Sequence, residues 1–153
     1  VIAMDINDER LAFCKEKLQV DFTINPITEN ALEKLQAITN NDMPTVIIDA
    51  TGSLKAINNA FQYLGHGGRY VLVGLQKGEI SFNHPEFHKR ESTLMSSRNA
   101  NKVDFDHVIA SMKQGLVKPT TYITHRVKFD EVKSNFESWL KPETGVIKAM
   151  IEF

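Results

Sequence analysis

Cysteine is almost absent from this sequence, which has Cys14 alone among its 153 residues. A single thiol excludes an internal disulfide and any metal site built from several cysteines. Cys14 falls on the apolar face of the first predicted helix, so we expect it to be a small core residue.

Long apolar runs and an excess of one charge are also missing. No stretch approaches the roughly 20 apolar residues of a membrane-spanning helix, and the formal net charge is -1. This balance gives no electrostatic reason to expect nucleic acid or a membrane as a partner. With 42% hydrophobic and 24% charged residues, the composition is typical of one soluble globular domain with its own core.

Apolar runs alternate with helical patterns along the chain, which favours a doubly wound parallel α/β sheet. The runs near residues 1–5, 45–49 and 69–73 have no polar alternation, so we expect these strands to be buried on both faces. Further short strands are predicted at 22–24, 79–83, within 92–101, near 124–129 and at 145–153. Helices are predicted at about 7–18, 31–38, 54–64 and 102–114, and after residue 130.

Polar residues before several helical patterns are candidate caps. We expect Thr28, Ser53 and Asp130 to cap the helices that follow them, and Gly65 to end the third helix. The helix at 102–114 carries an apolar face that should point inward, and Trp139 beside Phe136 should be a core residue. That face consists of Phe105, Val108, Ile109 and Met112.

Small or acidic residues recur where three predicted strands end, at Met4-Asp5, Asp49-Ala50-Thr51-Gly52 and Val73-Gly74-Leu75. Open α/β sheets bind ligands at the carboxyl ends of their strands, where small residues let a flat ligand approach the backbone. An acid in the position of Asp5 would hold the hydroxyls of an adenine ribose and repel a 2′-phosphate, which favours NAD over NADP. The alternatives are that Asp5 only caps the next helix and that the glycines only make turns.

The phosphate-binding pattern G-x-G-x-x-G is absent. In a dinucleotide-binding fold it lies about 20 residues before the ribose acid, which here would precede residue 1. The sequence also has no initiator methionine and no lead-in before its first strand, so we expect it to begin within a fold.

The histidines do not form a recognisable metal motif. The nearest candidate, "HPEFH", contains a proline and has no helical periodicity, so solvated or structural histidines are favoured over metal ligands. The five are His66, His84, His88, His107 and His125.

From end to end the sequence resembles the C-terminal, NAD-binding half of a zinc-type medium-chain alcohol/polyol dehydrogenase. Within that family, "PEFHKRESTLMSSRNA" is most similar to the L-galactonate and L-idonate 5-dehydrogenase branch. Ser96 stands where relatives commonly have glycine. The other matching stretches are "VIAMDINDERLAFCKE", "VIIDATGS", "GHGGRYVLVGL", "LMSSRNAN", "YITHRVKFDEV" and "GVIKAMIEF".

The resemblance implies a set of cofactor-binding residues and no catalytic or metal-binding residue in this chain. Asp5 corresponds to the ribose acid and Arg10 to a basic residue beside the adenosine. Three segments correspond to contacts along the cofactor, and Lys148 to a basic residue against the pyrophosphate. The segments are Ala50, Thr51 and Gly52 at the adenosine, Val73, Gly74 and Leu75 at the nicotinamide side, and Ser97, Arg98 and Asn99 at the carboxamide.

The resemblance also implies a cytoplasmic oxidoreductase that transfers a hydride between NAD and a secondary alcohol such as a polyol, sugar or sugar acid. A Rossmann-type domain lacking its first strand and Gly-rich loop would span residues 1–120. Residues 121–153 would return toward a catalytic domain that supplies zinc, so this chain alone should be inactive. Residues 79–83 would form an edge strand that joins a homodimer or homotetramer. A class I S-adenosylmethionine-dependent methyltransferase fragment is the alternative.

Overall fold

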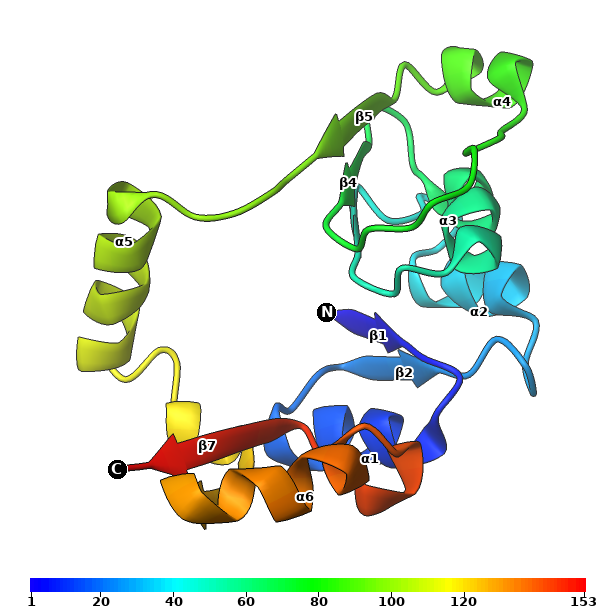
Figure 1. Cartoon of the computed structure of the whole chain (residues 1–153). Helices are drawn as coiled ribbons and strands as arrows, with labels where there is room; N and C mark the ends of the chain where they lie inside the picture. Colours follow the sequence, from blue (N-terminus) through cyan, green and yellow to red (C-terminus); the bar gives the residue numbers. More distant parts are fainter. The chain divides into compact units, whose positions relative to one another are not determined.

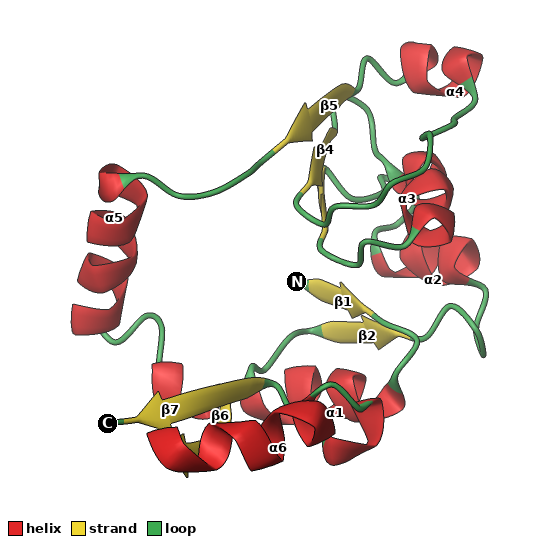
Figure 2. Ribbon diagram, viewed as in Figure 1, coloured by secondary structure: helices red, strands yellow, loops and turns green.

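The computed structural model describes residues 1–153, which divide into two compact units, Val1–Asn99 and Ala100–Phe153 (Figures 1 and 2). In the first unit strands and helices alternate, as the sequence pattern predicts. A 3₁₀ turn, η1 (Phe61–Tyr63), follows the third helix. The elements are β1 (Ile2–Met4), α1 (Asp8–Lys17), β2 (Phe22–Ile24), α2 (Ala31–Ile38), β3 (Val46–Asp49), α3 (Leu54–Ala60), β4 (Arg69–Leu72), α4 (His84–Lys89) and β5 (Thr93–Ser96).

Every strand pair in this unit is parallel, which confirms the predicted α/β class. One sheet has the order β1-β2 and the other has the order β3-β4-β5. In the first, Ile2 pairs with Phe22, and in the second, Asp49 pairs with Leu72. The outer edges of β1 and β3 have no strand partner.

The prediction that the apolar strands are buried on both faces is wrong for β3. Val46 is 45% exposed and Ile48 is 67% exposed, while β1 is only half-buried along its length. The physical reason is an uncovered face: side chains alternate along a strand, so Val46 and Ile48 share one exposed face of β3, while Ile47 and Asp49 lie on the other, more buried face.

Two small apolar clusters hold the first unit together. One joins Ile57, Leu64 and Tyr70, and the other joins Ile24 and Leu35. The Tyr70 hydroxyl donates a hydrogen bond to the Ile57 carbonyl oxygen at 3.1 Å. The first cluster therefore ties β4 to α3.

The helix starts confirm one expected cap and correct another. Ser53 Oγ accepts from the Ala56 amide at the start of α3, as predicted. Asn30 rather than Thr28 caps α2, because Asn30 directly precedes the first helical residue and accepts from the Glu33 amide. Helix α3 ends at Ala60 and continues as η1, so it stops before Gly65.

Residues 79–83 do not form a strand in the single chain, contrary to the sequence prediction. The segment lies against α3 instead, since the Ser81 amide donates to Asn58 Oδ1 at 3.1 Å. Phe82 stacks on Phe61 with ring centroids 4.6 Å apart. An edge strand is recognised by its hydrogen-bonded neighbour, and here no strand lies beside the segment.

The second unit contains two helices and one parallel strand pair. Strand β6 carries a register irregularity between Ile123 and His125. None of the helices of the whole structure is long and apolar enough to cross a membrane. The elements are α5 (Lys102–Lys113), β6 (Ile123–Lys128), α6 (Val132–Trp139) and β7 (Lys148–Glu152).

Three side-chain predictions fail in this unit. The face of α5 that should point inward is exposed, with Phe105 at 61%, because no other helix or strand packs extensively against it. Asp130 does not cap α6, since a 3₁₀ turn (Phe129–Glu131) precedes this helix and Glu131 occupies the cap position. Trp139 is half-buried beside Phe136 rather than in a core. Cys14 in the first unit is likewise half-buried.

We expect Tyr70→Phe to lower the free energy of unfolding by about 1 kcal/mol, because it removes a buried hydrogen bond. Tyr63→Phe is the control, since its hydroxyl makes no hydrogen bond in the structure and its ring is kept. Urea unfolding followed by circular dichroism measures both. Equal unfolding midpoints for Tyr70→Phe and the unchanged chain would contradict the assigned role.

Candidate functional site

Asp5 lies at the carboxyl end of β1 with its carboxylate fixed by a short turn. Its own amide donates to the Ile24 carbonyl oxygen at 3.2 Å, which continues the β1-β2 pairing by one residue. Its Oδ1 accepts from the Asn7 amide at 2.9 Å. Arg10 Nη1 lies 3.7 Å from Asp5 Oδ2. The structure therefore brings together the two residues expected at the adenosine.

Helix α1 is capped by Asn7 and not by Asp5. The Asn7 side chain accepts from the amides of Glu9 and Arg10, so the alternative that Asp5 only caps this helix is wrong. Asp5 is left at the strand end with one oxygen held by the backbone and the other facing a guanidinium.

The end of β3 is organised by Asp49, a buried carboxylate that sequence reasoning left out of the site. Its Oδ1 accepts from the Thr51 amide at 3.0 Å and its oxygens accept from the Thr51 hydroxyl. The Thr51 hydroxyl oxygen then accepts from the Ser53 amide at 3.0 Å. The available signal was an acid at the end of an apolar strand, directly before small residues.

Asp49 also affects the core beneath the site. Tyr70 is fully buried on the neighbouring strand. Burial, together with the negative charge of Asp49, raises the pKa of the Tyr70 hydroxyl well above its usual value. The hydroxyl therefore stays protonated and keeps donating to α3.

The ends of β3 and β4 are in direct backbone contact. The Asp49 carbonyl oxygen accepts from the amides of both Val73 and Gly74, at 2.8 and 2.9 Å. A Cβ on Gly74 would lie 2.5 Å from the Gly52 nitrogen, and Gly52 has a φ of +63°. These two glycines are therefore required by geometry, one for close approach and one for a left-handed backbone.

The loop after β5 lies next to the end of β4. The Ser97 amide donates to the Leu72 carbonyl oxygen at 2.9 Å, and Asn99 has a φ of +62°. Ser96 pairs regularly with Leu72 as the last residue of β5, so serine is accommodated where the sequence resemblance leads one to expect glycine. Ser97, Arg98 and Asn99 are exposed.

The predicted site residues thus fall into three groups. Asp5 and Arg10 lie at the end of β1, and Lys148 begins β7 in the other unit. The third group occupies the joined ends of β3, β4 and β5. It consists of Ala50, Thr51, Gly52, Val73, Gly74, Leu75, Ser97, Arg98 and Asn99.

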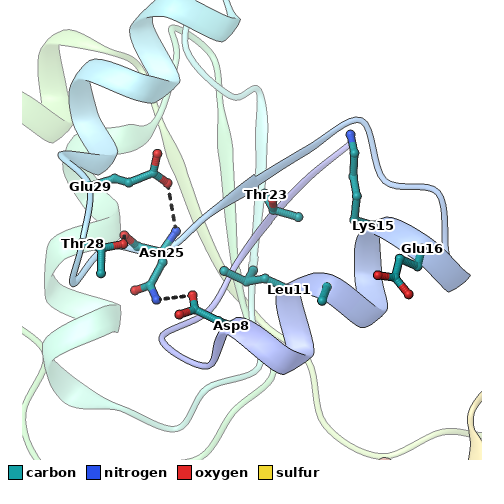
Figure 3. A pocket seen from close by; sticks show the side chains of 9 residues that line it. Asp8, Leu11, Lys15, Glu16, Thr23, Asn25, Thr28 and Glu29 are labelled. Carbon is teal, nitrogen blue, oxygen red and sulfur yellow. Dashed lines mark hydrogen bonds between the residues drawn. The ribbon is translucent and has the colours of Figure 1, made fainter.

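An open pocket of about 370 Å³ lies along α1 and β2, and it contains none of the predicted site residues (Figure 3). Its walls carry both acidic and basic side chains, so they define no single class of ligand. The lining residues are Asp8, Leu11, Ala12, Lys15, Glu16, Thr23, Asn25, Thr28 and Glu29.

The histidines lie on or near the surface. His84 and His88 face each other across one turn of α4, with ring centroids 5.7 Å apart, and His125 Nδ1 lies 2.9 Å from Thr124 Oγ1. No group of three or more His, Cys, Asp or Glu side chains is arranged to hold a metal ion.

A family model described as zinc-binding dehydrogenase matches residues 1–114. The chain belongs to this family, which confirms the resemblance noted in its sequence.

Curated relatives include enzymes named for sugar acids and polyols. L-galactonate-5-dehydrogenase from Escherichia coli (strain K12) is 35% identical over all of this chain and 45% of its own length. L-arabinitol 4-dehydrogenase from Aureobasidium melanogenum is 28% identical over 99% of this chain and 42% of its own. The chain thus spans less than half the length of the relatives it matches. These names give no support to the methyltransferase alternative.

Solved structures confirm a Rossmann-type fold. An Escherichia coli oxidoreductase/dehydrogenase of unknown specificity superposes with a TM-score of 0.89 at 22% identity, over 99% of this chain and 43% of the other. An alcohol dehydrogenase from E. coli CFT073, complexed with cofactor NADH, superposes with a TM-score of 0.86 at 30% identity, over all of this chain and 44% of the other.

We expect Gly74→Ala to destabilise the first unit by about 1–3 kcal/mol, because the added methyl overlaps the Gly52 backbone and the two loops must move apart. Gly78→Ala is the matched control, since its Cβ would meet only the ends of the flexible Leu54 and Gln76 side chains. Urea unfolding and amide exchange at Thr51 and Gly52 measure the effect. Equal behaviour of the two variants would show that the close approach at Gly74 is not required.

Proposed function

We propose that this chain is the cofactor-binding half of an NAD-dependent dehydrogenase that transfers a hydride between a secondary alcohol and NAD. The observation that carries the proposal is the Asp5 carboxylate at the end of a parallel strand, held by the Asn7 amide with a guanidinium beside it. Family membership and the NADH complex of one structural relative support it.

The residues of the first unit fit an adenosine dinucleotide. Asp5 would accept hydrogen bonds from both ribose hydroxyls, and its charge would repel a 2′-phosphate. The joined ends of β3 and β4 present backbone without side chains at Gly52 and Gly74, where a flat ring can approach closely. Exposed amides at 97–99 would hold the carboxamide, and Lys148 would neutralise the pyrophosphate.

NAD, when bound, supplies the hydride chemistry, and this chain's residues bind and orient it. We propose no catalytic residue among the 153. The zinc ligands of the enzyme are proposed to lie outside this chain, because its own side chains form no such set. The substrate is proposed to be a polyol, sugar or sugar acid, as the names of the relatives suggest. We place the enzyme in the cytoplasm, acting without nucleic acid or a membrane.

We also propose that residues 79–83 join two copies of the chain by adding strand to strand across a two-fold axis, giving a homodimer or homotetramer. The Ser81 amide is bonded inward to Asn58. Because alternate residues of an extended segment direct their amides to opposite sides, Ile80 and Phe82 would present theirs to a partner.

In the dehydrogenase that contains this chain, we expect Asp5→Ser to lower kcat/KM for NAD by about 10- to 100-fold. A charge-assisted hydrogen bond contributes about 1.5–3 kcal/mol, and about 1.4 kcal/mol corresponds to tenfold. NADP should be used relatively better, because the repulsion is removed. Steady-state kinetics with both cofactors tests this. Glu9→Ala is the control, since it removes a nearby exposed carboxylate of α1 that is not part of the proposed site. An unchanged preference for NAD over NADP would remove Asp5 from this role.

We expect Ile80→Pro to shift the assembly toward monomers, because proline removes an outward-facing amide that a partner strand would need. Ile80→Ala is the control, since it loses the same side chain and keeps the backbone amide. Sedimentation equilibrium of both variants distinguishes them. An assembly of the same size in both would place the interface elsewhere.

A further inference from the structure

We propose that Asn25 is a positioning residue for cofactor selection, which fixes the Asp5 carboxylate through the Ile6–Asn7 peptide group. The inference rests on the proposed function, in which Asp5 contacts the ribose. Asn25 is not among the site residues that the sequence predicts. It follows the neighbouring strand β2 and acts on Asp5 indirectly, through one peptide group.

Asn25 is a buried polar side chain that directly follows β2. It is only 6% exposed, and Figure 3 shows its amide directed at Asp8. Its Nδ2 donates to Asp8 Oδ1 at 2.7 Å and to the Ile6 carbonyl oxygen at 3.3 Å. Its Oδ1 accepts from the Ile27 amide at 3.0 Å. The side chain therefore joins the turn after β2 to the loop after β1.

The chemistry of these partners requires an amide at position 25. The Ile6 carbonyl and the Asp8 carboxylate can only accept, and the Ile27 amide can only donate. Asparagine offers two donors and an acceptor in that arrangement. Aspartate has the same shape but cannot donate, and its charge would repel Asp8.

The connection to Asp5 passes through a single peptide group. The carbonyl oxygen that accepts from Asn25 belongs to Ile6, and the next amide, that of Asn7, donates to Asp5 Oδ1 at 2.9 Å. These two groups belong to one planar unit, so they rotate together. If the bond from Asn25 is lost, the peptide can rotate and the Asp5 carboxylate loses its orientation.

The test compares Asn25→Asp with Asn30→Ala in the dehydrogenase that contains this chain. Asn30 caps α2 and its side chain hydrogen-bonds Glu33, so its loss tests the effect of general destabilisation. We expect Asn25→Asp to lower the ratio of kcat/KM for NAD to that for NADP by about tenfold, because a misplaced group loses its selectivity. Asn30→Ala should leave the ratio unchanged. A proportional fall with both cofactors in Asn25→Asp would reduce Asn25 to a structural residue and overturn the proposal.

A second measurement tests the linkage itself and does not depend on the function. Amide hydrogen exchange of chain 1–153, followed by NMR, should become faster at Asn7 in Asn25→Asp and not in Asn30→Ala. Asp8→Ala is a milder change that removes only one of the two acceptors of the Asn25 amide, so we expect a smaller increase in exchange at Asn7. This variant keeps the test possible if Asn25→Asp does not fold. Unchanged exchange at Asn7 in both Asn25→Asp and Asp8→Ala would overturn the proposal. If exchange changes as expected but Asp5→Ser leaves cofactor preference intact, the linkage between Asn25 and Asp5 stands and the proposed role of Asp5 at the ribose fails instead.

Discussion

The close approach of two backbones at the ends of β3 and β4 is the constraint on which the candidate site depends. The Asp49 carbonyl oxygen accepts from two successive amides, and this geometry leaves no room for a side chain at Gly74. The Asp49 carboxylate holds Thr51 from the other side. Because both the backbone and the carboxylate of Asp49 hold these loops, the proposed ligand would meet a backbone surface that needs little ordering, which would keep the entropic cost of binding low.

A second polar arrangement, at the end of β1, is independent of the first. There the Asp5 carboxylate is held by one backbone amide, and that amide belongs to a peptide group held by Asn25. Both arrangements use a buried polar residue at the end of a strand. Asp49, the last residue of β3, orients the loop that follows it, and Asn25, directly after β2, orients the loop after β1. Each such residue must be fully hydrogen-bonded, since an unpaired buried polar group costs about 1–3 kcal/mol. The polar residues at these strand ends therefore contribute both to folding and to the presentation of the site.

The sequence was informative where a signal is local. The apolar runs located the strands, and the recurrence of small residues located the ends of β3 and β4. It failed where the outcome depends on distant residues. Val46 and Ile48 are apolar but exposed, because they share the face of β3 over which nothing packs. Threonine is a common helix-capping residue, but Thr28 lies in a turn in which its amide donates to the Asn25 carbonyl oxygen. The role of Asn25 is not visible in the sequence, because its partners lie 17 and 19 residues away.

We propose that the ends of the parallel strands bind an adenosine dinucleotide. The most direct measurement is an NMR titration of ¹⁵N-labelled chain 1–153 with NAD, carried to concentrations at which weak binding is visible. The amide resonances of Asp5, Thr51 and Gly74 should shift together and saturate with one dissociation constant. Shifts confined to the pocket along α1 and β2, at Lys15 and Thr23, would contradict it.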